Sequence, residues 1–309
     1  MTTIVYTHPA CIAHDPGPNH PEAPQRLRAI AAALAEERFA PLERRAAPLA
    51  ELSQIERVHP RAYIDQVFRV VPKSGHSRLD ADTVLSPASG DAALRATGAV
   101  LAAVDEVLGG GADGAFCAVR PPGHHAEPRH AMGFCVFNSV AVAAEHARAV
   151  HGLERVAVVD FDVHHGNGTQ AMFENVPDLF YASTHQWPLY PGTGAPNERG
   201  VADNIVNAIL RPGEGSAEFR EAVTGAVLPA LRRFRPELII VSAGFDGHTR
   251  DPLAQINLAT EDYAWVTRVL TDAAAELCDG RIVSALEGGY DLEALAASVA
   301  VHVSELMGG

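Results

Sequence analysis

The chain has 309 residues, of which 47% are hydrophobic and 20% are charged, a composition typical of a globular protein long enough for one large α/β domain. Its formal net charge of -14 argues against nucleic-acid phosphate as a partner and modestly favours cationic substrates, although an acidic surface also serves solubility. The cysteines are spread widely without a CxxC pair, so the sequence indicates neither a disulfide framework nor a cysteine zinc site.

Strand-like and helix-like segments alternate along the chain. The pattern predicts helices at 91–108, 139–150, 216–234 and 260–278, and strands at 114–119, 155–160, 178–183, 237–242 and 281–286. Strands of nearly continuous apolar character between helices predict a mostly parallel sheet covered on both faces, a three-layer α/β/α fold. Because no internal repeat, low-complexity tract or linker-like change in composition interrupts the chain, residues 1–309 are predicted to form one domain.

Chemically reactive residues follow four of the predicted strands. Ligands of parallel α/β sheets bind at the carboxyl ends of the strands, where loops gather groups that are remote in sequence. We therefore expect four adjacent strand ends to line one binding site. They would contribute the tandem histidines His124 and His125, the segment 160–169, Asp246 and Tyr290.

The segment 160–169 predicts a metal site. Asp162 and His164 lie two residues apart, so on an extended backbone they point to the same side, as does Asp160. With Asp246 they would make a three-ligand set with open positions, as in catalytic zinc sites, although two carboxylates and one imidazole also suit Fe²⁺. A lone Asp-x-His is more often a helix cap beside a packed histidine, but Asp246 and the tandem histidines favour the metal.

His124 and His125 follow Pro-Pro-Gly, a rigid turn rather than a packed element. One imidazole near a metal-activated water can take and return a proton, and Asp160 and Asn167 are suitable acceptors to orient the two rings. Their different charges would push the two histidine pKa values apart. A tandem pair alone is weak evidence, since a metal-ligand or a purely structural role is also plausible.

Tyr290 follows Gly288 and Gly289, which permit backbone conformations closed to other residues. Its phenol could donate to a developing oxyanion. A tyrosine after a glycine pair is more often a packing residue, and only its place at the fourth strand end favours the catalytic interpretation.

Seven motifs cover the chain in order from about residue 8 to residue 291. They are His20-Pro-Glu-Ala-Pro-Gln-Arg-Leu27, Arg120-Pro-Pro-Gly-His-His-Ala126, Gly133-Phe-Cys-Val-Phe-Asn138, Asp160-Phe-Asp-Val-His-His-Gly-Asn-Gly-Thr169, Gly244-Phe-Asp246, Asp251-Pro-Leu253 and Leu286-Glu-Gly-Gly-Tyr290. In these residues the chain resembles the histone deacetylase superfamily, especially class II histone deacetylases and bacterial histone deacetylase-like amidohydrolases.

This resemblance implies an arginase-like α/β fold and metal-dependent hydrolysis of an N-acyl amide. It implies zinc ligated by Asp162, His164 and Asp246, with His125 as the general base and acid and Tyr290 as the donor to the oxyanion. It also implies that Asn167 accepts from His125 and that His124 pairs with Asp160. Class I members carry Asp where Asn167 stands, which favours class II.

Further positions match the family's substrate and ion sites. Phe134 and Tyr190 match the aromatic walls around the acyl-lysine stem, Gly133 leaves room for that stem, and Arg26 matches the arginine near the acetate-release cavity. For Tyr190 an ordinary packing role stays open. The resemblance also implies a structural potassium ion, with Ser183 as a side-chain ligand and mainly backbone carbonyls as the other ligands, to which we assign Asp160, Asp162, His164, Ser183 and Thr184.

The substrate is less well determined, because relatives act on acetyl-lysine, acetylated polyamines and other acyl amides. Leu253 stands where polyamine-selective eukaryotic relatives place a glutamate, which favours a broad acyl-lysine-type deacylase over an acetylpolyamine deacetylase. Asp80 and Asp82 in the segment 73–89 could recruit a distal ammonium, but that segment is predicted to be a solvent loop. Acyl-lysine peptides or proteins, or small acylated amines, are the predicted partners, with no nucleic acid and no membrane.

Two other classes stay open at this point. A two-metal ureohydrolase shares the presumed fold, but His248 stands two positions after Asp246, where a second metal would require another carboxylate. A non-catalytic metal-stabilised binding module is disfavoured because every catalytic position carries the active residue type. The amino terminus lacks the pattern of a signal peptide and no window approaches a membrane-spanning length, so we expect an unprocessed cytoplasmic protein.

Overall fold

The computed structural model describes residues 2–309 and is built around a parallel sheet. Its eight strands lie in the order β2-β1-β5-β10-β9-β6-β7-β8, and each neighbouring pair is parallel. A separate antiparallel ribbon joins β3 (Ser77–Arg78) and β4 (Val84–Leu85). The strands of the large sheet are β1 (Thr3–Thr7), β2 (Glu43–Ala46), β5 (Gly114–Cys117), β6 (Val156–Asp160), β7 (Leu179–Gln186), β8 (Ile205–Leu210), β9 (Leu238–Ala243) and β10 (Ile282–Leu286).

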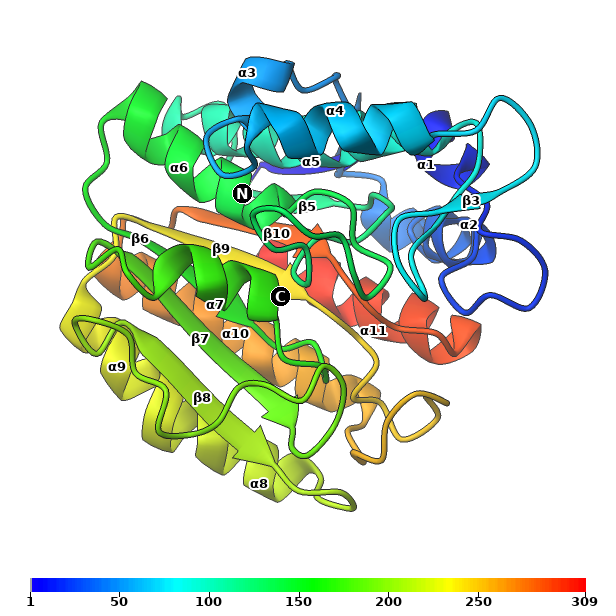
Figure 1. The fold of residues 1–309 in the computed structure, drawn as a ribbon. Helices are drawn as coiled ribbons and strands as arrows, with labels where there is room; N and C mark the ends of the chain where they lie inside the picture. The colour runs from blue at the N-terminus through cyan, green and yellow to red at the C-terminus, as the bar shows by residue number, and fades with distance from the viewer. Residues whose placement is uncertain (1) are drawn as a thin grey trace.

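Helices cover both faces of this sheet, which confirms the predicted three-layer α/β/α architecture (Figure 1). On one face α5 (Ser89–Leu108) packs against α6 (Ser139–His151). On the other face α11 (Leu292–Leu306) packs against both α10 (Thr260–Leu277) and α2 (Gln25–Ala33). The other helices are α1 (Pro9–Ala13), α3 (Leu52–Ile55), α4 (Arg61–Val70), α7 (Asn167–Phe173), α8 (Ser216–Ala222) and α9 (Leu228–Phe234), with a 3-10 turn at Glu37–Phe39.

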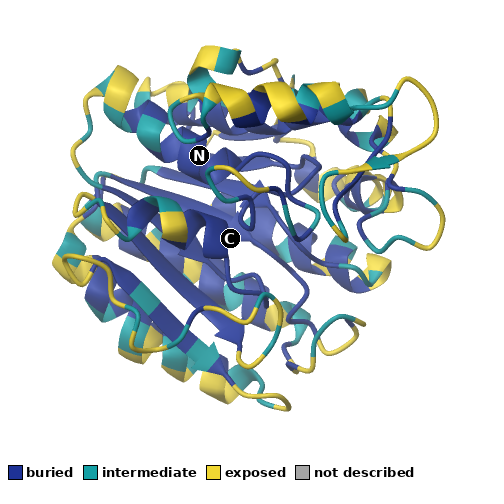
Figure 2. Cartoon of the chain, viewed as in Figure 1, coloured by how far each residue is buried: buried dark blue, intermediate teal, exposed yellow. Residues whose placement is uncertain are grey.

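The central strands are buried on both faces. Every residue of β5, β6, β9 and β10 is buried, and Figure 2 shows the central strands as a buried layer with the exposed residues on the outer sides of the helices and on loops. Because both faces of such a strand are covered, most of its side chains are apolar, which explains the nearly continuous Val, Ile and Ala runs in the sequence. The five predicted strands are all present, within a few residues of their predicted ends.

Some elements differ from the sequence prediction. The helix predicted at 216–234 is divided into α8, a π-helical turn at Val223–Val227 and α9. Pro229 lacks the N–H that would bond the carbonyl of residue 225, and the helix widens just before it. The pattern also did not predict β1, β2, β8 or α11. The edge strand β2 carries Glu43, Arg44 and Arg45, so it has no apolar pattern to recognise.

The strand order brings the four reactive segments together. The strands β5, β10, β9 and β6 are consecutive in the sheet, which confirms that the four strand ends are adjacent. The loop that carries Tyr290 is fixed at its far end because the Asp291 side chain accepts from the N–H of Ala294 at 2.8 Å and so caps α11.

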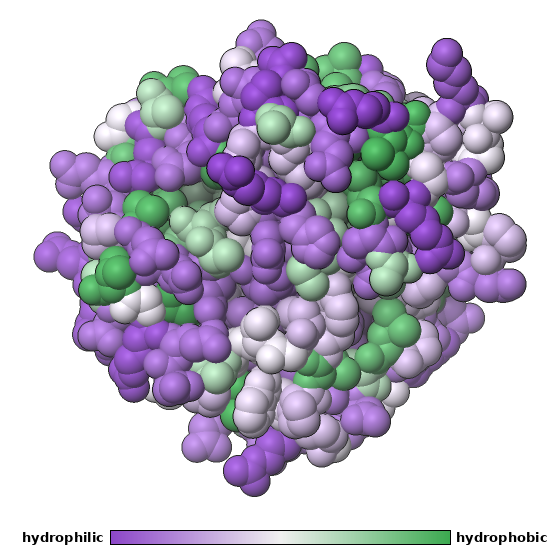
Figure 3. Space-filling model, in the orientation of Figure 1, coloured by the Kyte–Doolittle hydropathy of each residue, from purple (hydrophilic) through white to green (hydrophobic). Residues whose placement is uncertain are grey.

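The surface and the helix lengths give a simple picture. The face drawn in Figure 3 is mostly hydrophilic, with apolar residues in small separate patches. Within residues 2–309, no helix combines the length and the apolar character that crossing a membrane requires.

Candidate active site

Three acidic and basic side chains converge where β6 and β9 end. Nδ1 of His164 lies 3.2 Å from Oδ1 of Asp162 and 3.0 Å from Oδ2 of Asp246. All three residues are buried, and their ligating atoms lie within 4.8 Å of one another. The strand β6 ends at Asp160, so Asp162 and His164 meet through a turn rather than through the alternation of an extended strand.

Backbone amides hold the two carboxylates of this triad (Asp162, His164 and Asp246) in place. Asp162 accepts from the N–H groups of His164 at 2.9 Å and Gly288 at 2.8 Å, and Asp246 accepts from Val163 at 2.9 Å. A Cβ at Gly288 would lie 2.1 Å from Oδ2 of Asp246, so only glycine permits this close approach. The side chains of the triad therefore come from the loops after β6 and β9, and the loop after β10 supplies a supporting amide.

The triad carries more negative than positive charge. Burial raises the pKa of Asp246, and the neighbouring Asp162 raises it further. Burial alone would lower the pKa of His164, but the hydrogen bonds and charges of Asp162 and Asp246 raise it to about 10. Two carboxylates that compete for one imidazole form a site that favours a bound cation.

The tandem histidines have different partners. Nδ1 of His124 lies 3.0 Å from Oδ2 of Asp160, and Nδ1 of His125 lies 2.9 Å from Oδ1 of Asn167. The amide of Asn167 donates to Glu127 at 2.8 Å, which orients its oxygen toward His125. The structure thus brings together each histidine and the acceptor that the sequence suggested for it.

These partners give the two histidine rings different protonation states. Burial alone would lower the pKa of His124, but the charges of Asp162 and Asp160 raise it to about 10. Burial lowers the pKa of His125 well below its ordinary value, and the charges of His124 and His164 lower it further. Near neutral pH the pair therefore contains one imidazolium and one neutral imidazole whose Nε2 carries a free lone pair, because Nδ1–H is donated to Asn167.

A pocket of about 250 Å³ opens above the triad. Tyr290 lies in its wall, with the Arg26 guanidinium 4.9 Å from the ring centroid. Burial raises the pKa of Tyr290 well above its ordinary value, and Arg26 opposes part of that rise, so the phenol keeps its proton and can donate it in a hydrogen bond. The pocket is lined by Asp82, His125, Gly133, Phe134, His164, Leu189, Tyr190, Leu253 and Tyr290.

Two aromatic rings border this pocket. The Tyr190 ring lies 5.2 Å from the His125 ring, and the Phe134 ring lies 6.0 Å from the Tyr290 ring. Gly133 has φ +57°, and a Cβ there would lie 2.3 Å from the His125 ring, so glycine allows the wall to approach the histidine. The pocket is consequently a narrow, largely apolar passage that ends at polar groups.

Arg26 lies behind the pocket rather than in its lining. Its Nε donates to Gly289 at 2.6 Å, and Nη2 donates to the carbonyl of Glu287. Ser183 on β7 is paired in register with Asp160 on β6, and Oγ of Ser183 lies 2.9 Å from Nδ1 of His185. The hydroxyl of Thr184 is buried without a hydrogen-bond partner among the described residues.

Sequence reasoning misjudged one carboxylate of this site, Asp82, and assigned no role to a second, Glu287. Asp82 lines the pocket and accepts from the N–H of Gly133 at 3.0 Å, so the prediction of a solvent loop for 73–89 is wrong for its second half. Glu287 is buried and accepts from the N–H groups of Gly123 at 2.7 Å and His124 at 3.1 Å. Glu287 stands in the seventh motif, Leu286-Glu-Gly-Gly-Tyr290. Its hydrogen-bond partners depend on the β5–β10 pairing, which no sequence pattern reveals.

Comparisons with known proteins agree with this geometry. A model of the histone deacetylase domain matches residues 20–306. The chain is 43% identical to an uncharacterized protein of Synechocystis sp., over 99% of this chain and 100% of that protein. It is 42% identical to a histone deacetylase-like amidohydrolase of Pseudomonas aeruginosa, over 88% of this chain and 72% of that protein. The solved HDA15 HD domain matches with a TM-score of 0.94 and 36% identity, over 99% of this chain and 88% of that chain.

Proposed function

The chain belongs to the histone deacetylase family, and from that premise we propose that it is a zinc-dependent amidohydrolase that removes acetyl or related acyl groups from acyl-lysine-type amines. The observation that carries the proposal is the convergence of the triad, the two differently paired histidines and Tyr290 at the end of one pocket. Residues 1–309 are proposed to form a single catalytic domain, and a cytoplasmic location stays a prediction.

Asp162, His164 and Asp246 would hold the metal ion. The fit is supported by the surplus of carboxylate charge and by contacts of 3.0 and 3.2 Å around one imidazole nitrogen. Two oxygen ligands and one nitrogen ligand suit Zn²⁺, and Fe²⁺ is the second choice. A bound ion would supply a Lewis acid that polarises the acyl carbonyl and acidifies water.

The protein's own groups would move the protons and stabilise charge. Nε2 of neutral His125 accepts a proton from the attacking water and later returns it to the leaving amine. The His124 imidazolium, held by Asp160, favours the negative charge that develops beside it. The Tyr290 hydroxyl donates to the oxyanion, because its raised pKa keeps it protonated.

The pocket walls support a linear aliphatic substrate. Phe134 and Tyr190 would enclose a methylene stem, and Leu253 would keep the mouth apolar. The carboxylate of Asp82 favours a donor on the substrate, and this observation keeps acetylpolyamine deacetylation as the second candidate. Asp82 already accepts from Gly133 and from the hydroxyl of Thr83, which reduces its capacity to recruit a free ammonium.

A structural potassium ion is proposed beneath the triad. Thr184, whose hydroxyl has no partner within residues 2–309, and the Asp160–Ser183 register pair support it. Its ligands would come from Asp160, Asp162, His164, Ser183 and Thr184.

The dinuclear alternative has less support. His248 lies near Thr260 and accepts from the N–H of Arg250 and does not join the triad. A neighbouring group, His124, Cys135 and Glu287, also lies close enough for one ion, but burial raises the pKa of the Cys135 thiol well above its ordinary value. A thiol that keeps its proton is a poor metal ligand.

A parallel turnover assay tests the proposal. Acetyl-lysine peptide, trifluoroacetyl-lysine and N-acetylputrescine are compared with and without a chelator. We expect faster turnover of the two lysine substrates than of N-acetylputrescine, and loss of activity after chelation that zinc restores. Preference for N-acetylputrescine would favour the polyamine candidate, and no turnover of any substrate by the zinc-loaded protein would refute the enzyme.

A further inference from the structure

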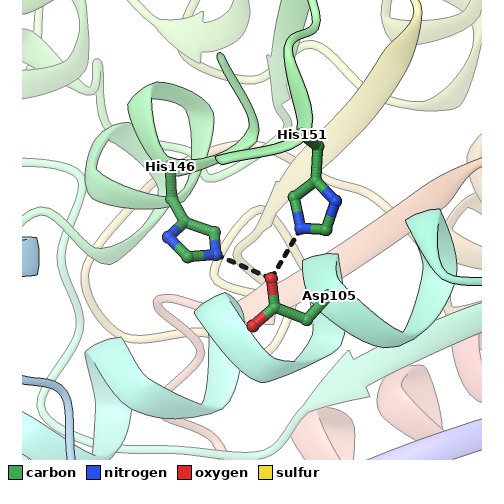
Figure 4. A group of neighbouring side chains, drawn as sticks. All are labelled: Asp105, His146 and His151. Carbon is green, nitrogen blue, oxygen red and sulfur yellow. Dashed lines mark hydrogen bonds and ion pairs between the residues drawn. The ribbon is translucent and has the colours of Figure 1, made fainter. Parts of the chain in front are cut away.

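Asp105, His146 and His151 form a second cluster of metal-ligating side chains outside the pocket (Figure 4). Asp105 lies in the last turn of α5, and the two histidines come from α6, of which His151 is the last residue. Nε2 of each histidine lies 2.7 Å from the same atom, Oδ1 of Asp105. Three potential ligands thus meet at one point between two helices.

This cluster lies near the amino-terminal ends of β5 and β6, whereas the pocket lies at the carboxyl ends of the strands. The helix α5 ends at Leu108 before β5 begins at Gly114, and α6 ends at His151 before β6 begins at Val156. The proposed catalytic residues instead follow the carboxyl ends of β5 and β6. Because the strands separate the two places, a ligand at this cluster takes no part in the chemistry of the pocket.

The three side chains differ in solvent exposure. The His146 side chain is only 4% exposed, because α6 packs against α5 there, whereas those of His151 and Asp105 are 24% and 49% exposed. A fixed histidine beside two more accessible ligands leaves a route for an ion and room for water. The second oxygen of Asp105, Oδ2, has no hydrogen bond within residues 2–309 and is free to join the ligand set.

We propose that Asp105, His146 and His151 bind a divalent transition-metal ion, with Zn²⁺ as the best match. Two imidazoles and one carboxylate are typical zinc ligands, and water would complete the coordination. Ligand atoms about 2.0 to 2.1 Å from a tetrahedral zinc lie about 3.3 Å apart, so the 2.7 Å contacts must open by roughly half an ångström. The exposed side chain of Asp105 can make that movement.

The surroundings of His146 set the expected affinity. A zinc-bound imidazole usually donates its other N–H to an acceptor, but Nδ1 of His146 is buried without a partner among the described residues. Binding in the micromolar range, weaker than that of a fully supported structural zinc, is therefore expected, on the order of 8 kcal/mol by conversion of that dissociation constant. The ion would link the ends of α5 and α6 and raise the melting temperature of the protein by mass action.

Calorimetric titration of zinc into the protein tests this site. The protein is first loaded with zinc at the triad and desalted, so that the titration reports further binding. Wild type should bind about one more equivalent, and Asp105→Asn and His151→Ala should each lose it, while His76→Ala, which removes an exposed histidine elsewhere, should retain it. His146 is left intact because it is buried and its replacement would disturb folding.

Asp105→Asn also separates metal binding from a purely structural hydrogen-bond cluster. Asparagine keeps an oxygen that accepts from both imidazoles but lacks the carboxylate charge. Its melting temperature without zinc should match that of wild type, and added zinc should raise the melting temperature of wild type by a few degrees and that of the variant by less. No additional equivalent in wild type, or an equivalent that persists in both Asp105→Asn and His151→Ala, would overturn the proposal.

This second ion changes how metal content must be interpreted. In excess zinc, two ions bound per wild-type chain would suggest a dinuclear centre unless the Asp105→Asn protein, which should bind one, is measured beside it. Because the readout is binding and not turnover, its outcome is independent of whether the proposed deacylation is correct.

Discussion

Two buried charge clusters of this protein have opposite electrical balance. In the first, the carboxylate of Glu22 accepts from Arg26 at 3.1 Å and from Arg120 at 2.6 Å, and His14 lies 3.3 Å away. In the second, Asp160, Asp162 and Asp246 share only His124 and His164, and Nε2 of His124 lies 3.9 Å from Oδ1 of Asp162. The first cluster, which we call balanced because cations of the protein neutralise its only carboxylate, directs its excess positive charge to backbone carbonyls. The second, which we call unbalanced because its carboxylates outnumber its histidines, favours a cation from outside.

The pKa shifts express the same difference. Burial would raise the pKa of Glu22, but Arg120 and His14 lower it well below its ordinary value. In the unbalanced cluster burial would raise the pKa of Asp162, but His124 and His164 lower it. For Asp246 burial and like charge prevail and raise the pKa, and they raise that of the nearby Asp251 to about 7. A balanced buried cluster stabilises the fold, and an unbalanced one marks a site for a ligand, so substitutions in the two clusters should have different consequences.

The largest expected effect is that of Asp246→Asn. Loss of one ligand charge should weaken zinc binding and lower kcat/KM about a thousandfold, since a bound Lewis acid supplies several kcal/mol of transition-state stabilisation. The metal-free variant should be no less stable than metal-free wild type, because the substitution removes a surplus negative charge. Zinc content, turnover and thermal unfolding measure these three effects. Full zinc content with normal turnover would remove Asp246 from the metal site.

Glu22→Gln should have the reverse effect, on stability rather than on metal binding. Breaking a buried ion pair from one side costs about 3 to 5 kcal/mol, and urea unfolding at pH 7 would measure that loss. Because the folded pKa of Glu22 is lowered, its contribution is present above its unfolded pKa of about 4.3 and is lost as the pH falls through the folded pKa. As the pH falls, the free energy of unfolding should therefore decrease less in the variant than in wild type.

A surface carboxylate provides the control for Glu22. Glu276 pairs with Arg232 while both side chains are 50% exposed, so Glu276→Gln should barely change the free energy of unfolding. If Glu22→Gln were as mild as this control, the Glu22 cluster would not stabilise the fold.

The sequence predicted the unbalanced cluster better than the balanced one. Asp162, His164 and Asp246 follow apolar strands, where acidic side chains have no packing role, and this contrast makes them visible in the pattern. Glu22 and Arg120 lie in loops without periodicity, and their pairing depends on segments about a hundred residues apart. Asp82 was misjudged for the same reason, because the fold of its loop over the pocket leaves no local signal.

Tyr290→Phe tests the remaining polar group at the pocket end. Removing one preorganised oxyanion donor should lower kcat about a hundredfold or more, while zinc content and KM stay close to wild type. Tyr190→Phe is the matched control, because its proposed role needs only the ring, so its kcat should change little. Unchanged kcat in Tyr290→Phe would assign the ring to packing against Arg26 and Phe134.

Glu287→Gln should have the smallest effect. It removes the charge of the side chain but keeps an oxygen that can hold the His124 turn, so it separates the effect of charge from that of geometry. Glu287 accepts from Gly123 and His124, and glutamine keeps an oxygen for both donors. Burial raises the pKa of Glu287 to about 7, above its unfolded value of about 4.3. Between these values the folded protein binds the extra proton, so wild-type stability falls as the pH rises from about 4 to 7.

Glutamine removes that titration. Metal-free Glu287→Gln should thus lose less stability than wild type between pH 5 and pH 8, as measured by thermal unfolding of chelated protein, while the zinc-loaded variant should keep kcat within about tenfold of wild type because the His124 turn is still held. Glu287→Ala removes the oxygen that accepts from both N–H groups and should lower kcat further. If Glu287→Gln were destabilised at pH 8 as strongly as Glu22→Gln, Glu287 would belong with the balanced cluster, and a surplus of negative charge would not distinguish the two regions.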